Sequence, residues 1–350
     1  MKIGNINSLL DSGVVTASAP CRIDFGGTLD ISTFHYPLRH LDAATVNIAL
    51  DARTTVTLHP LDDDRIRISS TGITQADFAP MAAPYDHPLG LMFAVADYFG
   101  ARGVHIDIRS ASPPKSGLGG SSVAAVALIG AFSKLLARMG GKGISKEQMV
   151  LVAHAIEQGV AGAPCGLQDH LAAAYGGVNR WHWPADPARP PFHRQRLLAD
   201  GQCTDLDPHL LVAYLGVTHV SKDVNGTWIR RFIGGRDREQ WHRIIRLTHR
   251  FADALTAFDL HTAADAMNRE TAVRRAMTPQ VIETMGDRLA ASAMDMGCGA
   301  RFTGAGGGGC LWAFGEAGAI ASLRPVWQGL LSERPSARLI DCRVDSRGVM

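Results

Sequence analysis

A glycine-rich loop between a strand-like segment and a long apolar segment places the tightest limit on how this chain can fold. Residues 104–109 (VHIDIR) alternate apolar and polar side chains, which is the pattern of a strand with one buried face. The loop at residues 113–122 (PPKSGLGGSS) follows, and residues 123–137 are rich in Ala and Leu and have high helix propensity. The sequence therefore predicts a strand, a glycine loop and a buried helix, in that order.

The composition of this loop suits an anion. Gly117, Gly119 and Gly120 lack side chains, so the backbone can approach a ligand closely. Successive backbone N–H groups that lead into a helix N-terminus bind phosphate well. We therefore expect a site for a di- or triphosphate. A tight strand-to-helix turn whose glycines serve packing alone is the alternative.

Polar side chains flank the same glycines. Lys115 adds a cation at the edge of the loop, and the hydroxyls of Ser121 and Ser122 can contact a phosphate oxygen or a Mg²⁺ ion. The chain contains no G-x-x-x-x-G-K-[ST] motif, which argues against a P-loop NTPase.

A second glycine cluster, at residues 304–309, matches G-x-G-x-x-G. A dinucleotide site of this type needs a helix after the glycines, but residues 310–314 (CLWAF) have the composition of an apolar strand. We therefore do not interpret this cluster as a Rossmann site.

The length of 350 residues favours two domains. Strand-like segments dominate before the proline-rich stretch at residues 186–191, and long helical patterns dominate after it, which predicts two α+β domains at residues 1–195 and 196–350. With 35 basic and 33 acidic residues, the net charge of +2 gives no sign of nucleic-acid or anionic membrane binding. Small-molecule chemistry is the expected function class.

The sequence indicates a soluble protein of the cytoplasm. We find no apolar run near the ~18 residues of a membrane span, and the first 15 residues lack the features of a leader peptide. The six cysteines form no CxxC pair, so we expect free thiols and neither zinc nor a disulfide framework.

Two helix boundaries stand out. Ser145, followed by Gln148 at capping-box spacing, begins a helix that carries Glu157 near its end. Thr278 and Pro279 predict the start of another helix, and Gly297 and Gly299 predict its end.

Glu157 and Asp169 are separated by several glycines and a proline, which turn the chain back, so the two carboxylates can converge. Phosphoryl transfer uses one carboxylate to hold Mg²⁺ and often another to orient or deprotonate the attacking hydroxyl. Arg22, in an apolar stretch, can keep an aspartate ionised or neutralise the phosphate. The alternatives are solvated surface carboxylates and a structural salt bridge.

Three segments together resemble the GHMP small-molecule kinase superfamily. Residues 19–27 (APCRIDFGG) are similar to its first motif, residues 113–122 to its ATP-binding second motif, and residues 302–310 (FTGAGGGGC) to its glycine-rich third motif. The motifs occur in family order and span nearly the whole chain. The resemblance implies the two-domain α+β GHMP kinase fold, with a ribosomal-protein-S5-like N-terminal domain and a ferredoxin-like C-terminal domain.

The resemblance also implies the site, with ATP and Mg²⁺ as cofactors. The implied ATP contacts are Lys115, Ser116, Gly117, Leu118, Gly119, Gly120, Ser121 and Ser122. The implied acceptor contacts are Asp30, Gln168, Asp169, Gly306 and Gly307. Ser121 and Glu157 are the implied metal ligands, and Asp169 with Arg22 the implied catalytic pair.

Within the superfamily, residues 166–177 (GLQDHLAAAYGG) resemble the bacterial D-glycero-D-manno-heptose 7-phosphate kinases, which implies phosphorylation of an anomeric hydroxyl. Galactokinase is the runner-up, and a catalytically silent sugar sensor is the alternative from another class. The implied partner is a sugar or sugar phosphate, bound by a monomer or homodimer, with no nucleic acid or membrane. A distal phosphate would need cations, for which His35, Arg39, His40 and Lys222 are candidates.

Overall fold

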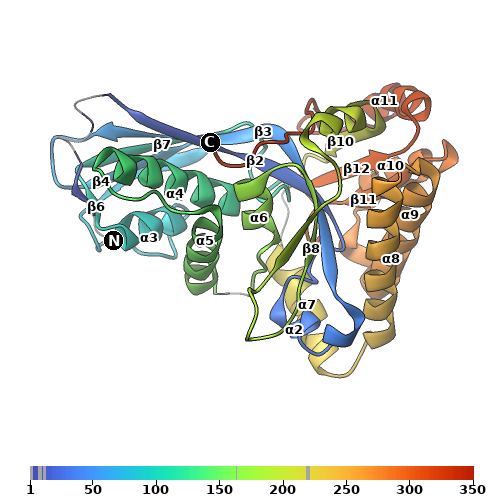
Figure 1. Ribbon diagram of the computed structural model, residues 1–350. Coiled ribbons are helices and arrows are strands. Elements are labelled where there is room, and N and C mark those ends of the chain that lie inside the picture. Colours follow the sequence, from blue (N-terminus) through green and yellow to red (C-terminus); the bar gives the residue numbers. More distant parts are fainter. Residues whose placement is uncertain (1–2, 7–9, 11–12, 163, 218–220) are drawn as a thin grey trace.

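The computed structural model describes the chain except for residues 1–2, 7–9, 11–12, 163 and 218–220. Figure 1 shows two parts side by side, one built on a seven-stranded sheet and the other on a four-stranded sheet. The long strands β2 and β3 reach from the first part to the boundary with the second. This mixed α+β architecture agrees with the fold class predicted from the sequence.

The first part is built from the elements that precede residue 200. They are β1 (Gly4–Asn5), β2 (Val15–Phe25), α2 (Ser32–His35), η1 (Arg39–Leu41), β3 (Ala44–Pro60), β4 (Ile66–Ser70), β5 (Ile73–Phe78), α3 (Gly90–Tyr98), β6 (Ala101–Arg102), β7 (Val104–Ser110), α4 (Gly120–Arg138), α5 (Lys146–Ala161), α6 (Gln168–Tyr175), β8 (Val178–His182) and β9 (His193–Arg196). The main sheet has the order β5-β4-β7-β3-β8-β9, with β2 paired to β3, and β1 pairs with β6 separately.

β3 is the central strand of this sheet. It pairs antiparallel with β2, while its first half pairs with β8 and its second half with β7. The register between β2 and β3 shifts at Pro20 and Cys21, and such a bulge bends the strand and redirects the side chains that follow. Arg22 is the next residue, so the bulge sets the direction from which it enters the site.

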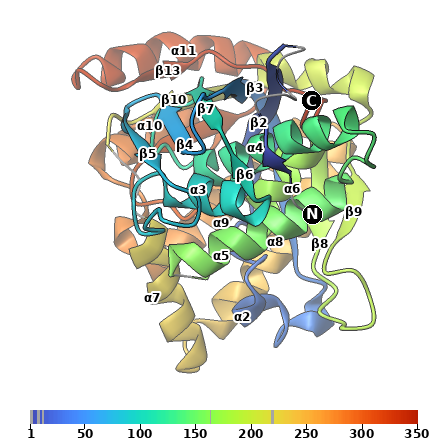
Figure 2. The ribbon, with the colours of Figure 1, turned by 90° about the vertical axis from the view of Figure 1, so that its left-hand side faces the viewer.

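The predicted strand, glycine loop and buried helix are confirmed as β7, the loop and α4. α4 packs between the sheet and helices α3, α5 and α6, some of which face the viewer in Figure 2. Contrary to the sequence expectation, α4 is long and apolar enough to cross a membrane by length and composition, but 78% of its apolar window is buried inside the fold. Core helices of soluble proteins pass the same test.

The predicted helix start at Ser145 is confirmed. The Ser145 side chain accepts a hydrogen bond from the Gln148 N–H, and the Gln148 side-chain oxygen accepts one from the Ser145 N–H, which completes the capping box of α5.

The second part contains the remaining elements and a sheet of order β11-β12-β10-β13, antiparallel throughout. The elements are η2 (Asp200–His209), β10 (Leu210–Tyr214), α7 (Ser221–Ile233), α8 (Arg238–Thr256), α9 (Leu260–Met277), η3 (Pro279–Val281), α10 (Thr284–Asp295), β11 (Gly299–Phe302), β12 (Cys310–Phe314), α11 (Ala317–Leu331) and β13 (Arg338–Ile340).

The predicted helix start at Thr278 is wrong. Thr278 ends α9 in an extended conformation, because the proline that follows disfavours the helical region for the residue before it. Residues 279–281 form a short 3-10 turn, and α10 begins only at Thr284, where the Glu283 side chain accepts a hydrogen bond from the Met285 N–H.

The last eight residues return to the first part. The Asp345 N–H donates to Ala49 O and the Asp345 carbonyl accepts from the Gly177 N–H, while Met350 and Ser18 pair in both directions. The C-terminus accordingly lies beside β2 and β3 in Figure 1. The division at residues 195/196 stays a prediction; it falls at the last residue of β9.

Arg53 holds this tail in place. Its guanidinium donates to Ser18 O at 2.9 Å and to Gly348 O at 2.7 Å, and it forms an ion pair with the buried Asp345. The side chain of Arg53 is only 13% exposed.

We therefore predict that Arg53→Ala lowers the free energy of unfolding by about 2–4 kcal/mol, because it leaves the Asp345 carboxylate buried without its main partner. Urea unfolding followed by circular dichroism measures the change. The matched control is Arg109→Ala, whose side chain is 80% exposed and should change stability by less than about 0.5 kcal/mol. Equal effects of the two substitutions would contradict this role for the tail.

Candidate active site

Arg22 and Asp169 meet at the start of α6, although they lie 147 positions apart in the sequence. Arg22 Nε donates to Asp169 Oδ1 at 2.8 Å, and Arg22 Nη2 lies 2.7 Å from the same oxygen. Burial opposes the charge of Arg22, but Asp169 and Asp24 raise its pKa above the ordinary value, so it stays a cation. Both of these contacts are made to Oδ1 of Asp169, and neither involves Oδ2.

The second oxygen faces the glycine loop. A Cβ added to Gly119 would lie 3.3 Å from Asp169 Oδ2, and Arg22 Nη1 donates to Gly117 O at 2.5 Å. The loop and the Arg22–Asp169 pair are therefore in direct contact.

The loop presents an open helix N-terminus. Gly119 caps α4 with a positive φ of 83° and makes no side-chain capping hydrogen bond. Gly120 and Ser121 are exposed, and a Cβ at Gly120 would meet nothing within 4 Å. The first N–H groups of α4 are thus available to an anion, which fits a phosphate group.

The other predicted loop residues divide into two groups. Lys115 is exposed at the edge of the loop, where it has a left-handed φ of 52°. Ser116 and Leu118 are buried beneath the loop, and the Leu118 carbonyl accepts a hydrogen bond from the Arg22 N–H.

Glu157, near the end of α5, lies directly below the start of α4. Its Oε1 accepts a hydrogen bond from Ser121 Oγ, and its Oε2 accepts one from Ser122 Oγ, both at 2.6 Å. His170 Nε2 lies 2.8 Å from Oε2. Although burial raises the pKa of Glu157, these three polar groups lower it to about 2, so the carboxylate is ionised near neutral pH.

This set of oxygen atoms fits a small divalent cation. Mg²⁺ prefers carboxylate, hydroxyl and phosphate oxygens and usually keeps several waters. Glu157 Oε1 and Ser121 Oγ supply two such atoms beside the exposed helix N-terminus. Among the residues that the structure describes, no cluster of three His, Cys, Asp or Glu side chains is arranged for a metal. A cation here would therefore take its other ligands from a phosphate and water.

Asp30 lies beside the start of α6. It is 5% exposed, and its Oδ2 accepts a hydrogen bond from the Gln168 N–H at 3.1 Å. A Cβ at Gly166 would lie 1.7 Å from this oxygen, so only glycine permits the approach. Burial, with a further contribution from Asp169, raises the pKa of Asp30 to about 7.

Gln168 connects Asp30 to the central strand. Its side-chain Oε1 accepts a hydrogen bond from Asn47 Nδ2 at 3.1 Å, and both side chains are buried. Gln168, Asp169 and Asp30 thus lie together, and their role as acceptor contacts stays a prediction.

The third motif contacts the glycine loop through residues near its two ends. Thr303 Oγ1 donates to Ser116 O at 3.3 Å, and a Cβ at Gly309 would lie 2.5 Å from the same carbonyl. Gly306 and Gly307, the predicted acceptor contacts, instead pack against Val281. These contacts do not involve Asp169 or Asp30, and the role of the two glycines stays a prediction.

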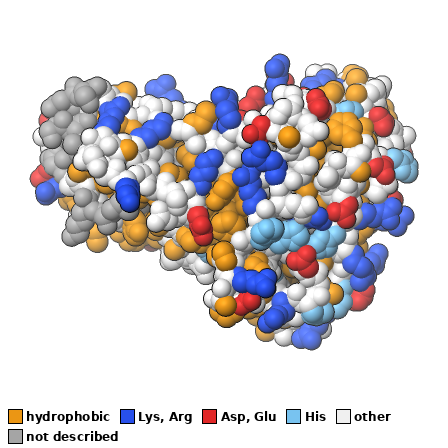
Figure 3. Space-filling model, viewed as in Figure 1, with side chains coloured by type: hydrophobic (Ala, Val, Ile, Leu, Met, Phe, Trp, Pro, Cys, Tyr) orange, Lys and Arg blue, Asp and Glu red, His pale blue; other side chains and the backbone are white. Residues whose placement is uncertain are grey.

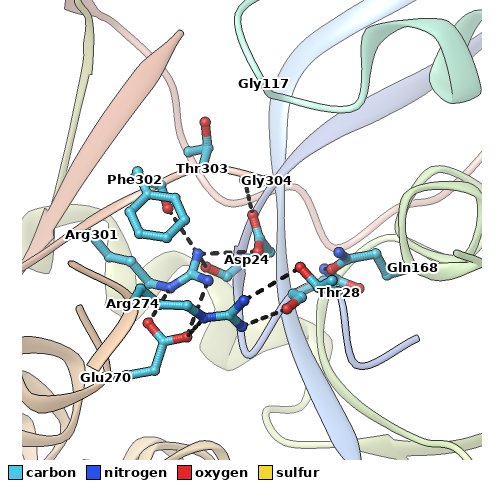
Figure 4. A network of polar contacts seen from close by, with 12 residues as sticks. Asp24, Thr28, Gly117, Gln168, Glu270, Arg274, Arg301, Phe302, Thr303 and Gly304 are labelled. Carbon is cyan, nitrogen blue, oxygen red and sulfur yellow. Dashed lines mark hydrogen bonds and ion pairs between the residues drawn. The ribbon is translucent and has the colours of Figure 1, made fainter. Parts of the chain in front are cut away.

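A buried charge network joins the two parts of the molecule behind this site (Figure 4). Arg301 Nη1 lies 3.2 Å from Asp24 Oδ2, and Arg301 Nε donates to Glu270 Oε2 at 2.8 Å. Arg274 donates to Glu270 Oε1 at 2.8 Å and to Gly27 O at 2.6 Å. The side chains of Arg274, Arg301 and Glu270 are fully buried.

Sequence reasoning missed this network. Asp24 lies within the first motif but had no role assigned, and Arg301 immediately precedes the third motif. Glu270 and Arg274 have the i, i+4 spacing of an ordinary surface pair on a helix. The one available signal was that Arg301 and Asp24 are charges within apolar segments.

Two other surface features lie apart from the site. A cavity of about 650 Å³ is lined by residues of η2 and the end of α8, none of which belongs to the site. Histidines gather between β8 and α8 on the face in Figure 3, where the rings of His193 and His249 lie 5.7 and 6.1 Å from that of His182. His182 Nδ1 lies 3.0 Å from Asp42 Oδ2, and His249 Nε2 lies 2.8 Å from Asp42 O.

The chain is similar in sequence to proteins of known activity. Residues 87–177 match the family model of the GHMP kinases N terminal domain. A mevalonate kinase of Pyrococcus horikoshii is 27% identical over 220 residues, which are 60% of this chain and 59% of the relative. A D-glycero-alpha-D-manno-heptose 7-phosphate kinase of Campylobacter jejuni is 23% identical over 209 residues, 58% of each chain. The chain thus spans just under three fifths of the length of these curated relatives.

Solved structures match over almost the whole chain. A D-glycero-D-manno-heptose 1-phosphate kinase from Bacteroides thetaiotaomicron has a TM-score of 0.74 at 18% identity, with 96% of this chain and 97% of that one covered. Lactococcus lactis galactokinase, solved with galactose, has a TM-score of 0.73 at 15% identity, with 99% and 97% covered. Residues 87–177 thus match the GHMP kinases N terminal domain, and the chain shares the two-domain α+β fold of these solved structures.

Proposed function

We propose that this protein is an ATP-dependent sugar kinase that phosphorylates the anomeric hydroxyl of a sugar or sugar phosphate. The contact between the Arg22–Asp169 pair and the open N-terminus of α4 carries this proposal. It brings a carboxylate suited to an acceptor hydroxyl against backbone N–H groups suited to phosphate.

The loop binds the phosphates of ATP in this proposal. The N–H groups of the first turn of α4, at Gly120 to Ser122, donate to phosphate oxygens, and the positive end of the helix dipole favours the negative charge. Lys115, exposed at the edge of the loop, adds a cation.

Ser121 and Glu157 hold Mg²⁺, which neutralises phosphate charge when bound. The low pKa of Glu157 keeps this carboxylate in the ionised form that a metal requires.

Asp169 handles the acceptor. Its Oδ2 accepts or orients the proton of the sugar hydroxyl while the hydroxyl oxygen bonds to the γ-phosphorus and the bond from that phosphorus to ADP breaks. Arg22 holds Oδ1 and so fixes the direction of Oδ2. Asp30 and Gln168, beside Asp169, contact the sugar.

We infer that the acceptor is a heptose 7-phosphate, with galactose or another monosaccharide as the alternative. The heptose-kinase-like segment at residues 166–177 and the Campylobacter jejuni relative support this choice. Of the predicted phosphate partners, His35 is unsuitable because burial lowers its pKa, so it is uncharged near neutral pH. Arg39 and His40 are exposed in η1, and the side chain of Lys222 lies outside the described residues.

We further propose that the enzyme works in the cytoplasm as a monomer or homodimer on a small-molecule substrate. The balanced charge and the burial of the apolar helix α4 support this setting.

The first prediction is Mg²⁺-dependent ADP release that requires an acceptor. A panel should include a heptose 7-phosphate, unphosphorylated heptose, galactose and mevalonate, because relatives of this chain act on several of these classes. We expect the 7-phosphorylated heptose to exceed galactose in kcat/KM by at least about tenfold, with a difference that shrinks as salt rises. Nucleotide binding without turnover of any acceptor would instead support a sensor, and efficient use of galactose at any salt concentration would support a galactokinase.

The second prediction concerns Asp169. Asp169→Asn keeps the shape of the side chain but removes the charge and the proton acceptor, so kcat should fall by about 10²–10⁴-fold with little change in acceptor affinity. The matched control is Asp253→Asn, which removes a carboxylate that is 68% exposed and should leave kcat unchanged. Loss of acceptor binding with an unchanged kcat at saturation would assign Asp169 to binding alone.

The third prediction concerns pH. The pKa of Asp30 is about 7 in the fold and about 4 in an unfolded chain, so the folded state holds the extra proton between these values. The stability from this proton is present below pH 4 and is lost as pH rises through 7. Between pH 5.5 and 8.5, the free energy of unfolding of the natural protein should fall by about 2 kcal/mol relative to Asp30→Asn. Urea titrations at several pH values measure this difference, and parallel pH profiles would contradict the raised pKa.

A further inference from the structure

His170 is a buried side chain to which the proposed mechanism gives no task. It is 1% exposed and follows Asp169 directly on α6. Its Nε2 lies 2.8 Å from Glu157 Oε2, so it touches the carboxylate proposed to hold the metal.

The two oxygens of Glu157 have different surroundings. Oε2 is in contact with Ser122 and His170, both of which are buried. Oε1 accepts a hydrogen bond from Ser121, which is exposed at the start of α4. Oε2 is therefore the anchored oxygen, and Oε1 is the one on the side of the open helix N-terminus.

A glutamate needs such an anchor because its terminal torsion is broad and a free carboxylate samples many orientations. The imidazole of His170 is itself held in place. It packs edge-on against the ring of His154 at 5.5 Å, and His154 Nε2 lies 3.0 Å from Cys165 O. His170 thus offers Glu157 a rigid partner.

We propose that His170 is a positioning residue that orients Glu157 so that Oε1, together with Ser121 Oγ, receives the divalent metal. This inference rests on the proposed function. It also gives α6 two tasks at consecutive positions, because Asp169 faces Arg22 and the acceptor while His170 sets the carboxylate for the metal. Substitution of a residue that holds a metal ligand in place typically lowers metal affinity by about 10–100-fold.

Two amide variants test the geometry, since both are polar and neutral. The amide nitrogen of Gln corresponds in reach to Nε2 of histidine, and that of Asn to Nδ1. Because the contact with Glu157 is made by Nε2, His170→Gln should preserve it and His170→Asn should lose it. His209→Gln is the matched control, since His209 lies at the end of η2, away from the site, and its Nδ1 lies 2.8 Å from Gly315 O.

The measurement is Mn²⁺ binding by electron paramagnetic resonance, with a non-hydrolysable ATP analogue present. We expect His170→Asn to weaken Mn²⁺ binding by about 10–100-fold and His170→Gln and His209→Gln by less than about threefold. Affinity for the analogue without metal should not change. Thermal unfolding of each variant shows that the fold is intact.

Several results would overturn the inference. If His170→Asn binds Mn²⁺ as tightly as the natural protein, or if His170→Asn and His170→Gln lose Mn²⁺ affinity equally, the contact does not orient Glu157. Equal loss of analogue affinity without metal would assign His170 to general packing. If the natural protein binds no Mn²⁺ with the analogue, the proposed function fails as well, whereas normal binding in the natural protein and in every variant overturns this inference alone.

Discussion

The carboxylate of Asp24 is the group on which the arrangement of the site depends. Its Oδ1 accepts a hydrogen bond from the Gly304 N–H at 2.6 Å and lies 3.4 Å from Arg22, while its Oδ2 lies 3.2 Å from Arg301. The first motif and the third motif are thus joined through one buried side chain. Removing one partner from such a buried pair typically costs about 3–5 kcal/mol, so this contact constrains both parts of the molecule.

The position of the reacting groups follows from that constraint. Arg22 is held between Asp24 and Asp169, so its charge is fixed where the loop turns into α4. Because Arg301 and Arg274 both contact Glu270, the second part of the molecule also fixes the turn at Gly27 that leads to Asp30. Preorganised charges of this kind in a buried site stabilise developing charge more than the same groups do in water.

Local patterns predicted the local features. The alternation in β7, the glycine loop and the capping box of Ser145 depend on nearby residues, and each appears in the structure where it was expected. Thr278 misled because a Thr-Pro pair also marks the end of a preceding helix. The Asp24 network and the Arg53 anchor join residues more than 200 positions apart, and no local pattern carries that information. The motif resemblance predicted which positions form the site, but the contacts of Asp24 and His170 became apparent only from the three-dimensional structure.

In the proposed site, the start of α4 holds the phosphates of ATP beside Glu157 and Asp169. A crystal structure of the protein with Mg²⁺ and a non-hydrolysable ATP analogue would locate these groups. We expect phosphate oxygens within hydrogen-bond distance of the N–H groups at Gly120 to Ser122, a metal bound by Ser121 Oγ and Glu157 Oε1, and the γ-phosphate on the side of Asp169 Oδ2. Phosphates bound away from α4, or a metal that leaves Glu157 in contact with only Ser122 and His170, would contradict this arrangement.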